Sequence, residues 1–359
     1  MWWTLLWRPG MLDATVEQDA IPPGRILLLG ASGLIGSHVL EQLAGAPAVE
    51  VVASSHARPP HLQASNVTWR TADLRDPVAC ANLMEGADRV LLAAGIVATA
   101  PVLASDPIAP IRDNLRIAEN VFAAAWRARV RSVVWLSSTT GYPESATPLD
   151  EEQMFEGEPP AAWRLLGGAT RWLETLARGL AERSDAHTAF VALRPSLVYG
   201  ERDDFSFERG HFVPALIRRV VERQDPLEVW GSGEERRDLV HAADVAAAML
   251  RATRLVGCHA FNVASGTSPS VNELLAKLIE IEGHHGARIV HLPGRPRSVG
   301  ERRFTNERLR AALGFVPRID LETGLIRTCD WFRAHREQAR LQDGLLPQHG
   351  AAGPGRPES

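Results

Sequence analysis

Gly30-Ala31-Ser32-Gly33-Leu34-Ile35-Gly36 is the stretch that decides the fold of this chain. The apolar run 26–29 before it has the length of a buried strand, and the apolar positions of 37–43 after it have helical spacing. A strand, a glycine turn and a helix in this order are typical of a dinucleotide-binding site, with an ordinary tight turn as the alternative. The first glycine permits the tight turn, the second lets the backbone approach a pyrophosphate, and the third lets helix and strand pack closely. The helix N-terminus then favours phosphate through its free N–H groups and its dipole.

The end of the next predicted strand, 49–53, indicates which dinucleotide the site takes. The residue that meets the adenosine ribose lies roughly 20 residues beyond the glycine turn. The chain has Ser54 and Ser55 there, and Arg58 follows. No carboxylate stands there to accept from a ribose 2′-hydroxyl, whereas hydroxyl groups and an arginine suit a 2′-phosphate. We therefore expect NADP as the cofactor, with NAD as the alternative; the simpler interpretation of Arg58 is a solvated loop residue.

Strand and helix patterns alternate along the first half of the chain. This alternation predicts an α/β fold with a Rossmann-type, doubly wound parallel sheet. Beyond residue 194, longer loops and shorter helices predict a smaller α/β lobe for substrate. The expected divisions are an N-terminal extension (1–23), a dinucleotide-binding domain (24–196, with 238–262 returning to it), a substrate lobe (197–237 and 263–335) and a disordered tail (343–359).

The composition excludes several classes of protein. Of the 359 residues, 45% are hydrophobic, which is enough for a large core. A formal net charge of −4 gives no argument for nucleic acid or a membrane surface as a partner. The cysteines Cys80, Cys258 and Cys329 lie far apart, so we expect no metal site, and free thiols in the cytoplasm. The apolar residues 1–7 are too few for a membrane span and lack the basic leader of a signal peptide.

Motifs of one family are spread over about 25–332. They are the glycine turn, Asp73-Leu74, the run LRPSLVYG at 193–200 and the run RDLVHAADV at 237–245. On these residues the chain resembles the extended short-chain dehydrogenase/reductase family, the NAD(P)-dependent nucleotide-sugar epimerases, dehydratases and reductases. The runs 138–143 and 210–219 are most similar to the GDP-fucose synthase branch. The C-terminal half also resembles the 4-ketoreductases of deoxysugar pathways, and the motifs do not separate the two.

The resemblance implies a set of residues along the cofactor. These residues are Gly30, Ser32, Gly33, Leu34, Ile35, Gly36, Ser54, Ser55, Arg58, Asp73, Leu74, Ala93, Ala94, Gly95, Asn114, Pro195 and Leu197.

The resemblance breaks at the catalytic residues. The family uses a Ser or Thr with a Tyr and a Lys, and the Lys lowers the pKa of the Tyr that exchanges a proton with the sugar hydroxyl. Ser138 lies at the Ser position, but Leu166 and Thr170 occupy the Tyr and Lys positions. Glu174 fits the family's Glu four residues further on, so this register is credible. Leucine cannot transfer a proton, and threonine supplies no positive charge.

Two side chains are candidates to replace the missing acid. Tyr142 follows Ser138 closely, and His211 matches the place of an acid in the GDP-fucose synthase branch, with a pKa suited to proton transfer near neutrality. A structural tyrosine and a polar loop histidine are the simpler interpretations. The resemblance further implies substrate contacts, with arginines for a nucleoside diphosphate. The residues implied are Ser138, Thr139, Thr140, His211, Arg237, Arg295 and Arg302.

Two functional hypotheses follow from these residues. The first is an epimerase or reductase that acts on a nucleotide-linked keto-sugar with non-standard catalytic residues. The second is a catalytically inactive protein on the same fold that binds dinucleotide or sugar nucleotide as a sensor or partner subunit. Dehydratases and decarboxylases of the family are disfavoured, because Thr139 and Thr140 stand where dehydratases have an acidic pair and the Glu of decarboxylases is missing. The resemblance also implies a homodimer.

Overall fold

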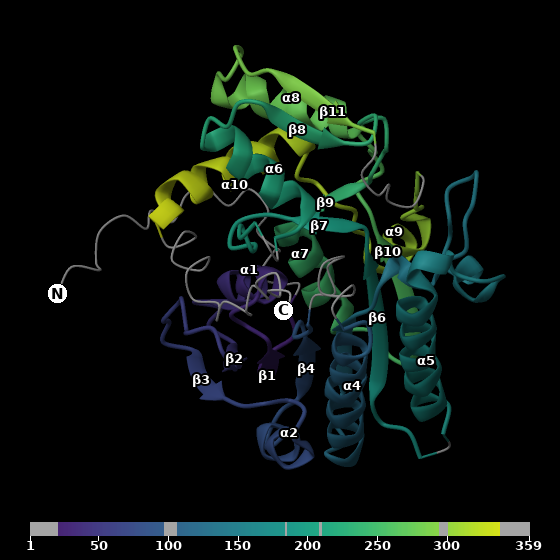
Figure 1. Ribbon diagram of the computed structural model, residues 1–359. Coiled ribbons are helices and arrows are strands. Elements are labelled where there is room, and N and C mark those ends of the chain that lie inside the picture. The colour runs from purple at the N-terminus through teal and green to yellow at the C-terminus, as the bar shows by residue number, and fades with distance from the viewer. Residues whose placement is uncertain (1–20, 97–105, 184, 208–209, 294–300, 338–359) are drawn as a thin grey trace, which may run out of the picture.

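The structure, a computed structural model, describes residues 21–96, 106–183, 185–207, 210–293 and 301–337 (Figure 1). The predicted tail, nearly all of the predicted N-terminal extension and Arg295 lie outside these residues.

Seven parallel strands form the main sheet, in the order β10-β6-β5-β4-β1-β2-β3. Read from β3, the first six strands have the 3-2-1-4-5-6 order of doubly wound dinucleotide-binding folds, so the predicted fold class is confirmed. The order reverses between β1 and β4. The strands are β1 (Gly24–Leu29), β2 (Val49–Ser55), β3 (Val67–Thr71), β4 (Arg89–Leu92), β5 (Ser132–Leu136), β6 (Ala189–Pro195) and β10 (Cys258–Val263).

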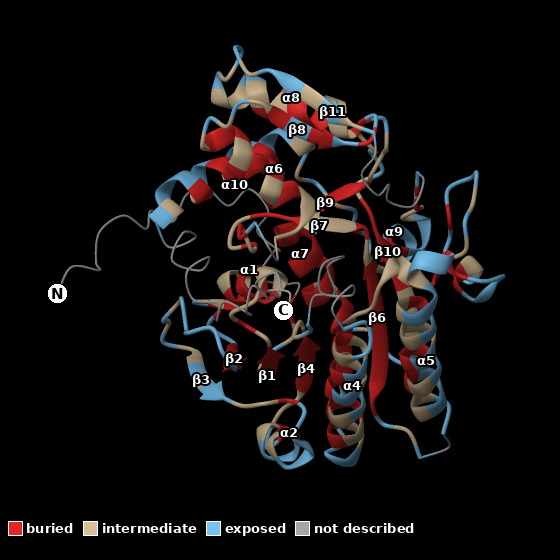
Figure 2. Cartoon of the chain, in the orientation of Figure 1, coloured by how far each residue is buried: buried red, intermediate tan, exposed pale blue. Residues whose placement is uncertain are grey.

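Alternate residues of β1 contribute to two hydrophobic cores, one on each face of the sheet. Ile26 and Leu28 pack in a core that includes residues of α1 (Leu34–Leu43) and α7 (Ala242–Ala252). Leu27 and Leu29 pack in the other core, with α2 (Pro77–Leu83), α4 (Ala109–Arg127) and α5 (Arg164–Ala181). Because both faces are covered, the strand is an unbroken apolar run instead of an alternating one. Figure 2 shows β1, β4 and β6 buried in this way.

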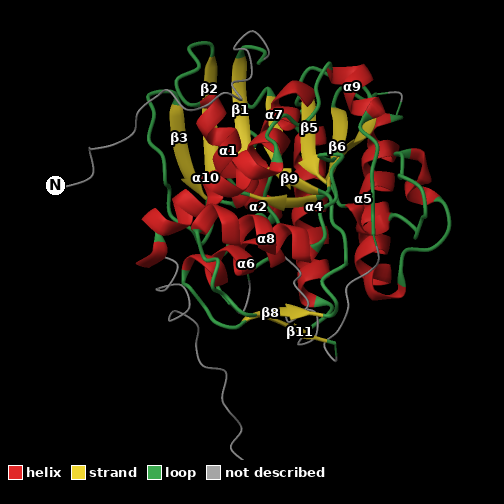
Figure 3. Ribbon diagram, turned by 90° about the horizontal axis from the view of Figure 1, so that it is seen from above, coloured by secondary structure: helices red, strands yellow, loops and turns green. Residues whose placement is uncertain are grey.

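A smaller lobe stands beyond the carboxyl ends of these strands (Figure 1). A short two-stranded sheet, β7 (Leu197–Tyr199) with β9 (Leu239–His241), lies between the lobe and the main sheet. The pair β8 (Leu227–Trp230) and β11 (Ile289–Leu292) lies apart from the main sheet when seen from above (Figure 3). Helices α6 (Phe212–Val221), α8 (Val271–Glu282) and α10 (Leu321–Ala334) share one core with β8, whereas α9 (Glu307–Leu313) packs against β10 and α7.

Within the described ranges, no helix combines the length and the apolar character needed to cross a bilayer.

Candidate functional site

The carboxyl ends of four neighbouring strands place many of the predicted site residues at one edge of the sheet. Gly30 follows β1, Ala93 follows β4 and Ser137 follows β5. Leu29 pairs in register with Leu92, and the pairing continues to β5 and β6. Ligands of open parallel sheets bind at this edge, where the strand order reverses.

The glycine turn has the geometry that a pyrophosphate requires. Gly30 has φ of +83°, and a Cβ there would lie 2.6 Å from the backbone of Ala94. A Cβ at Gly36 would lie 2.1 Å from the carbonyl oxygen of Gly30, so only glycine allows α1 to pack this closely on the turn. Helix α1 begins after Gly33, and no side chain caps its first turn. The free N–H groups of this turn fit the phosphates of a dinucleotide.

Gly36→Ala is expected to lower the free energy of unfolding by about 1–3 kcal/mol, because the added methyl group forces α1 away from the turn. Equilibrium unfolding in urea measures the change. Gly179→Ala, within α5, is the matched control: a Cβ there meets nothing within 4 Å. That variant should gain about 0.4–1 kcal/mol. Equal losses in both variants would contradict the close approach at Gly36.

The end of β2 offers one exposed cation. The Ser54 hydroxyl accepts from the Gly30 amide at 3.2 Å, and Ser54 and Ser55 are both buried. Ser54 therefore supports the glycine turn, whereas the Ser55 carbonyl accepts from the Ala72 amide. Arg58 remains exposed, with Nη2 3.8 Å from Oδ2 of Asp204. Of the three residues predicted for the ribose, Arg58 is the one whose polar group faces outward.

Two further residues predicted for the cofactor support neighbouring backbone. Asp73 accepts from Arg75, and this pairing lowers the pKa of Asp73 to about 2. Asn114 of α4 holds Ile96 from both sides: its Oδ1 accepts from the Ile96 amide at 2.7 Å, and its Nδ2 donates to the Ile96 carbonyl at 2.8 Å. Asn114 thereby fixes Ile96, the residue that directly follows Ala93–Gly95.

Ser138 belongs to a chain of hydroxyl groups between β5 and α5. Its Oγ accepts from the amide and the hydroxyl of Thr140, at 3.1 and 3.0 Å. The Thr140 hydroxyl lies 3.4 Å from that of Thr170, which donates to the Leu166 carbonyl at 3.0 Å. The structure therefore brings Ser138 together with position 170, where the resemblance expects a lysine.

The first turn of α5 lies directly on the 3-10 turn η2 (Thr139–Gly141). A Cβ at Gly167 would lie 2.6 Å from the Thr140 carbonyl oxygen. This close approach fixes Leu166 and Thr170 beside residues 138–142, which we call the serine loop. The Leu166 side chain is half-buried and offers no group for proton transfer.

A buried polar network lies behind Ser138. Arg194 donates to both carboxylate oxygens of Glu174, at 2.9 and 2.5 Å. Ser137 donates to Glu174 at 2.5 Å, and Arg194 also donates to the Tyr142 hydroxyl at 2.7 Å. That hydroxyl in turn donates to Oδ1 of Asn262 at 2.6 Å. Each buried charge thus has an opposite charge and further hydrogen bonds, as a stable buried pair requires.

The network places Tyr142 differently from the catalytic role expected of it. Its side chain is fully buried, and its hydroxyl both donates and accepts inside the network. Burial raises the pKa of Tyr142 to about 12. A phenol with these contacts is a structural group and is poorly suited to exchange a proton with a substrate.

Arg302 likewise does something other than the diphosphate contact expected of it. Its guanidinium is buried and donates to the carbonyls of Thr139 and Tyr142, at 2.9 and 2.8 Å. Burial lowers the pKa of Arg302 to about 10. Arg302 therefore holds the loop that carries Ser138 and Thr139. Arg237, which forms an isolated β-bridge with Arg302, is half-buried, and its Nη1 donates to the Arg236 carbonyl.

His211 lies just before α6 and pairs with a carboxylate. Its Nδ1 is 3.0 Å from Oδ1 of Asp203, which is almost fully buried. Burial by itself lowers the pKa of His211, but the hydrogen bond to Asp203 and the charge of Asp204 outweigh it and raise the pKa above its usual value. A raised pKa favours the protonated imidazole, which is the form that acts as an acid.

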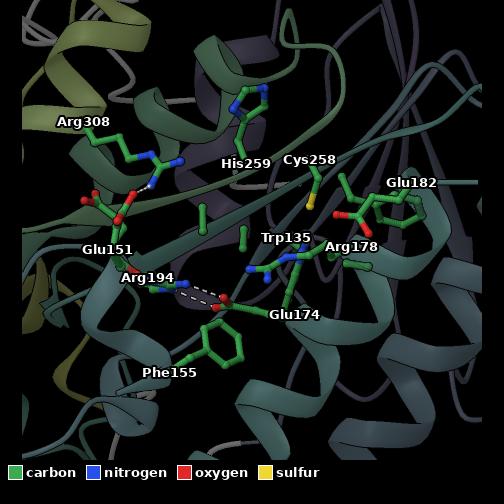
Figure 4. Close-up of a pocket in the computed structure, with 15 residues that line it drawn as sticks. Trp135, Glu151, Phe155, Glu174, Arg178, Glu182, Arg194, Cys258, His259 and Arg308 are labelled. Atoms are coloured by element: carbon green, nitrogen blue, oxygen red, sulfur yellow. Dashed lines mark hydrogen bonds and ion pairs between the residues drawn. The ribbon is translucent and has the colours of Figure 1, made fainter. Parts of the chain in front are cut away.

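A cavity of about 400 Å³ is lined by residues of α5, β6 and β10, among them Glu174, Arg194 and Cys258 (Figure 4). Figure 4 shows the Arg194 guanidinium facing the Glu174 carboxylate there. None of the residues predicted for cofactor, catalysis or substrate lines it. Glu174 and Arg194 of the polar network line the cavity, which is not the predicted site.

Sequence reasoning misses Asp203, the carboxylate that pairs with His211. The signal available is the run of four charged residues from Glu201 to Asp204, directly after Tyr199-Gly200.

Comparisons with known proteins indicate the family of this chain. The sequence profile of the NAD dependent epimerase/dehydratase family matches residues 26–264. The chain is 28% identical over 318 residues to the GDP-L-fucose synthase of Sinorhizobium fredii, covering 86% of this chain and 95% of that protein. It is also 28% identical over 322 residues to the dTDP-4-dehydro-6-deoxy-D-allose reductase of a Streptomyces species, covering 87% and 97%.

Among solved structures, MoeE5 in complex with UDP-glucose and NAD is similar with a TM-score of 0.73 and 26% identity. The likeness covers 87% of this chain and 100% of that one. The profile match, the relatives and the sheet order agree, and the chain belongs to the NAD dependent epimerase/dehydratase family, among the extended short-chain dehydrogenases/reductases.

Proposed function

We propose that this protein binds NADP(H) and acts as a reductase or epimerase-reductase on a keto-sugar linked to a nucleoside diphosphate. The relatives include a GDP-L-fucose synthase and a dTDP-sugar reductase, and MoeE5 binds UDP-glucose and NAD. The observation that carries the proposal is the glycine turn after β1, where the strand order of the sheet reverses. The helix after this turn, α1, has no side-chain cap, so its first N–H groups remain for a phosphate.

Arg58 is the basis for NADP over NAD. The end of β2 has no carboxylate to accept from a ribose 2′-hydroxyl, and the two serines there are buried. The Arg58 guanidinium is exposed at this strand end and suits a phosphate.

Ser138, Thr140 and His211 are the groups we assign to the carbonyl of the sugar. NADPH, when bound, would supply the hydride for the carbonyl carbon. A hydroxyl from the Ser138–Thr140 pair donates a hydrogen bond to the carbonyl oxygen, where negative charge develops. His211 gives that oxygen its proton, which converts the alkoxide to an alcohol. Arg237 is the arginine we assign to the diphosphate, since Arg302 is engaged with the serine loop.

Arg58→Ala is expected to weaken NADPH binding by roughly 10–100-fold, because a charge-assisted hydrogen bond contributes about 1.5–3 kcal/mol. NADH binding should change little, since NADH carries no 2′-phosphate. Calorimetric titration of the wild-type protein and the variant with each nucleotide measures both effects. NADH serves as the control within each protein.

Two outcomes would overturn parts of this proposal. If neither nucleotide binds the wild-type protein, the redox function fails. If NADPH binds and Arg58→Ala weakens both nucleotides equally, NADP specificity at Arg58 fails and NAD becomes the cofactor to test.

The second candidate function is binding of dinucleotide and sugar nucleotide without catalysis. Leu166 favours it, because a hydrocarbon side chain stands where the family has its tyrosine. Turnover with a nucleotide-linked keto-sugar would exclude this candidate.

We also propose a homodimer in the cytoplasm. Helices α4 and α5 lie side by side, and the Trp172 indole of α5 donates to Glu119 of α4 at 3.2 Å while half of its surface stays exposed. Leu165 is exposed on the same helix as Trp172.

All three cysteines are free thiols, which fits a reducing compartment.

A further inference from the structure

The segment Glu201–Asp204 consists of four consecutive charged residues, and two of them form ion pairs with helices on either side, α10 of the small lobe and α1 of the main domain. Glu201 binds Arg327 of α10 at 2.8 Å, and Arg202 binds Glu41 of α1 at 2.6 Å. Arg202 has φ of +68°, a conformation that L-residues with side chains rarely adopt. These contacts fix the segment over the helix that follows the glycine turn.

Asp203 turns its side chain inward from this fixed segment toward His211. The side chain of Asp203 is 2% exposed, and its Oδ2 has no hydrogen-bond partner among the described residues. Its Oδ1 accepts from the Asp204 amide at 2.8 Å and faces Nδ1 of His211 at 3.0 Å. A buried carboxylate is costly unless it is paired, and His211 is the one cationic side chain the structure shows bound to it within the described ranges.

The pairing settles which nitrogen of His211 is available. A carboxylate accepts, so the hydrogen bond to Asp203 uses the proton on Nδ1. Nε2 is then the nitrogen left for a ligand, and 28% of the His211 side chain remains exposed. A carboxylate that orients a histidine in this way resembles the third group of a proton-transfer relay.

Within the part of the chain that the structure describes, Asp204 and Arg58 are two further charged groups that act on His211, and their side chains lie 3.8 Å from each other. Arg58 opposes a proton on the imidazole, whereas Asp203 and Asp204 favour it. Asp203 is the member of this set in direct contact.

We propose that Asp203 is a positioning residue for His211: it holds the imidazole with Nε2 toward the substrate and keeps it protonated for transfer to the sugar oxygen. This role rests on the proposed reductase function. The Asp203 side chain is almost fully buried, so its removal should affect the chemical step more than substrate binding.

Asp203→Asn tests the proposal, with Asp204→Asn as the matched control on the next residue. Loss of a contacting opposite charge should lower the pKa of His211 by roughly 1–3 units, and the control should lower it by less than half as much. Titration of the ring protons by NMR measures this, with His211→Gln used to assign the signal. Asp203→Asn should also lower kcat for a dTDP-linked 4-keto-6-deoxyhexose, with KM nearly unchanged, by less than the roughly 10²–10⁴-fold of a general acid.

The outcomes separate the positioning role from the proposed function. An unchanged pKa in Asp203→Asn, or a larger shift in Asp204→Asn, overturns the positioning role. Wild-type protein that binds NADPH but turns over no nucleotide-linked keto-sugar overturns the proposed function and this role with it. If Asp203→Asn does not fold, Asp203→Glu replaces it. The positioning role then requires that the pKa of His211 stays above its usual value while kcat falls. An unchanged kcat in Asp203→Glu overturns the role.

Discussion

Replacing Glu174 by alanine is expected to lower the free energy of unfolding by about 3–5 kcal/mol. The carboxylate is the only anion the structure shows bound to the Arg194 guanidinium among the described residues, and both side chains are almost fully buried. Removal of one partner of a buried pair leaves an uncompensated charge, which accounts for the size of the loss. Ser137 also loses its acceptor. Equilibrium unfolding in guanidinium chloride measures the difference.

Asp185→Ala is the control for this variant. Asp185 pairs with Arg183 at 2.9 Å, but both side chains are about half exposed. Water screens an exposed pair, so the free energy of unfolding of the control should stay close to that of the wild-type protein. If the free energy of unfolding of Glu174→Ala also stayed close to the wild-type value, the network would not be a main source of stability for this part of the fold.

Leu166→Tyr combined with Thr170→Lys is expected to raise kcat for reduction of a dTDP-linked 4-keto-6-deoxyhexose by roughly 10²–10⁴-fold, the range of a positioned general acid. Thr170 already lies 3.4 Å from the Thr140 hydroxyl, and Gly167 holds this turn of α5 against the serine loop. A lysine at 170 would lower the pKa of a tyrosine at 166 by the proximity of its charge. Oxidation of NADPH, followed by absorbance, measures the rate.

Leu165→Tyr with Thr170→Lys controls for the added side chains, because Leu165 is 62% exposed and faces away from the core. That variant should stay near the wild-type rate. Unchanged kcat in the first variant, with NADPH binding intact, would show that position 166 does not face the substrate. A loss of rate would show that the protein uses chemistry that the restored pair disturbs.

The fold and the glycine turn follow from local patterns in the sequence. The apolar run 26–29 predicts a strand buried on both faces, and the glycine spacing predicts the turn at Gly30 and the close packing at Gly36. The positions of Leu166 and Thr170 follow from their spacing to Glu174, because residues four apart share one face of a helix. Each of these features depends on residues that are neighbours in the chain.

The parts that sequence reasoning places wrongly or misses depend on distant contacts. The hydroxyl of Tyr142 is buried against Asn262, 120 residues away, and nothing near Tyr142 in the chain indicates this. Arg302 donates to the serine loop across 163 residues, a contact that its resemblance to a diphosphate-binding segment does not indicate. Asp203 is missed because the run of charged residues 201–204 does not show which of its carboxylates faces His211.

The outer strand of the main sheet carries a consequence for synthesis of the chain. Elements of the small lobe, among them α6 and β8, come before α7 and β10 in the chain. Residues 196–257 separate β6 from β10. At about 5–20 residues per second, a ribosome needs roughly 3–12 s to add those residues. During that interval the edge of β6 has no neighbour and the face of α1 that α7 covers, where Gln42 later binds Ala243, is open. The nascent chain therefore offers chaperones an apolar surface that the finished protein hides.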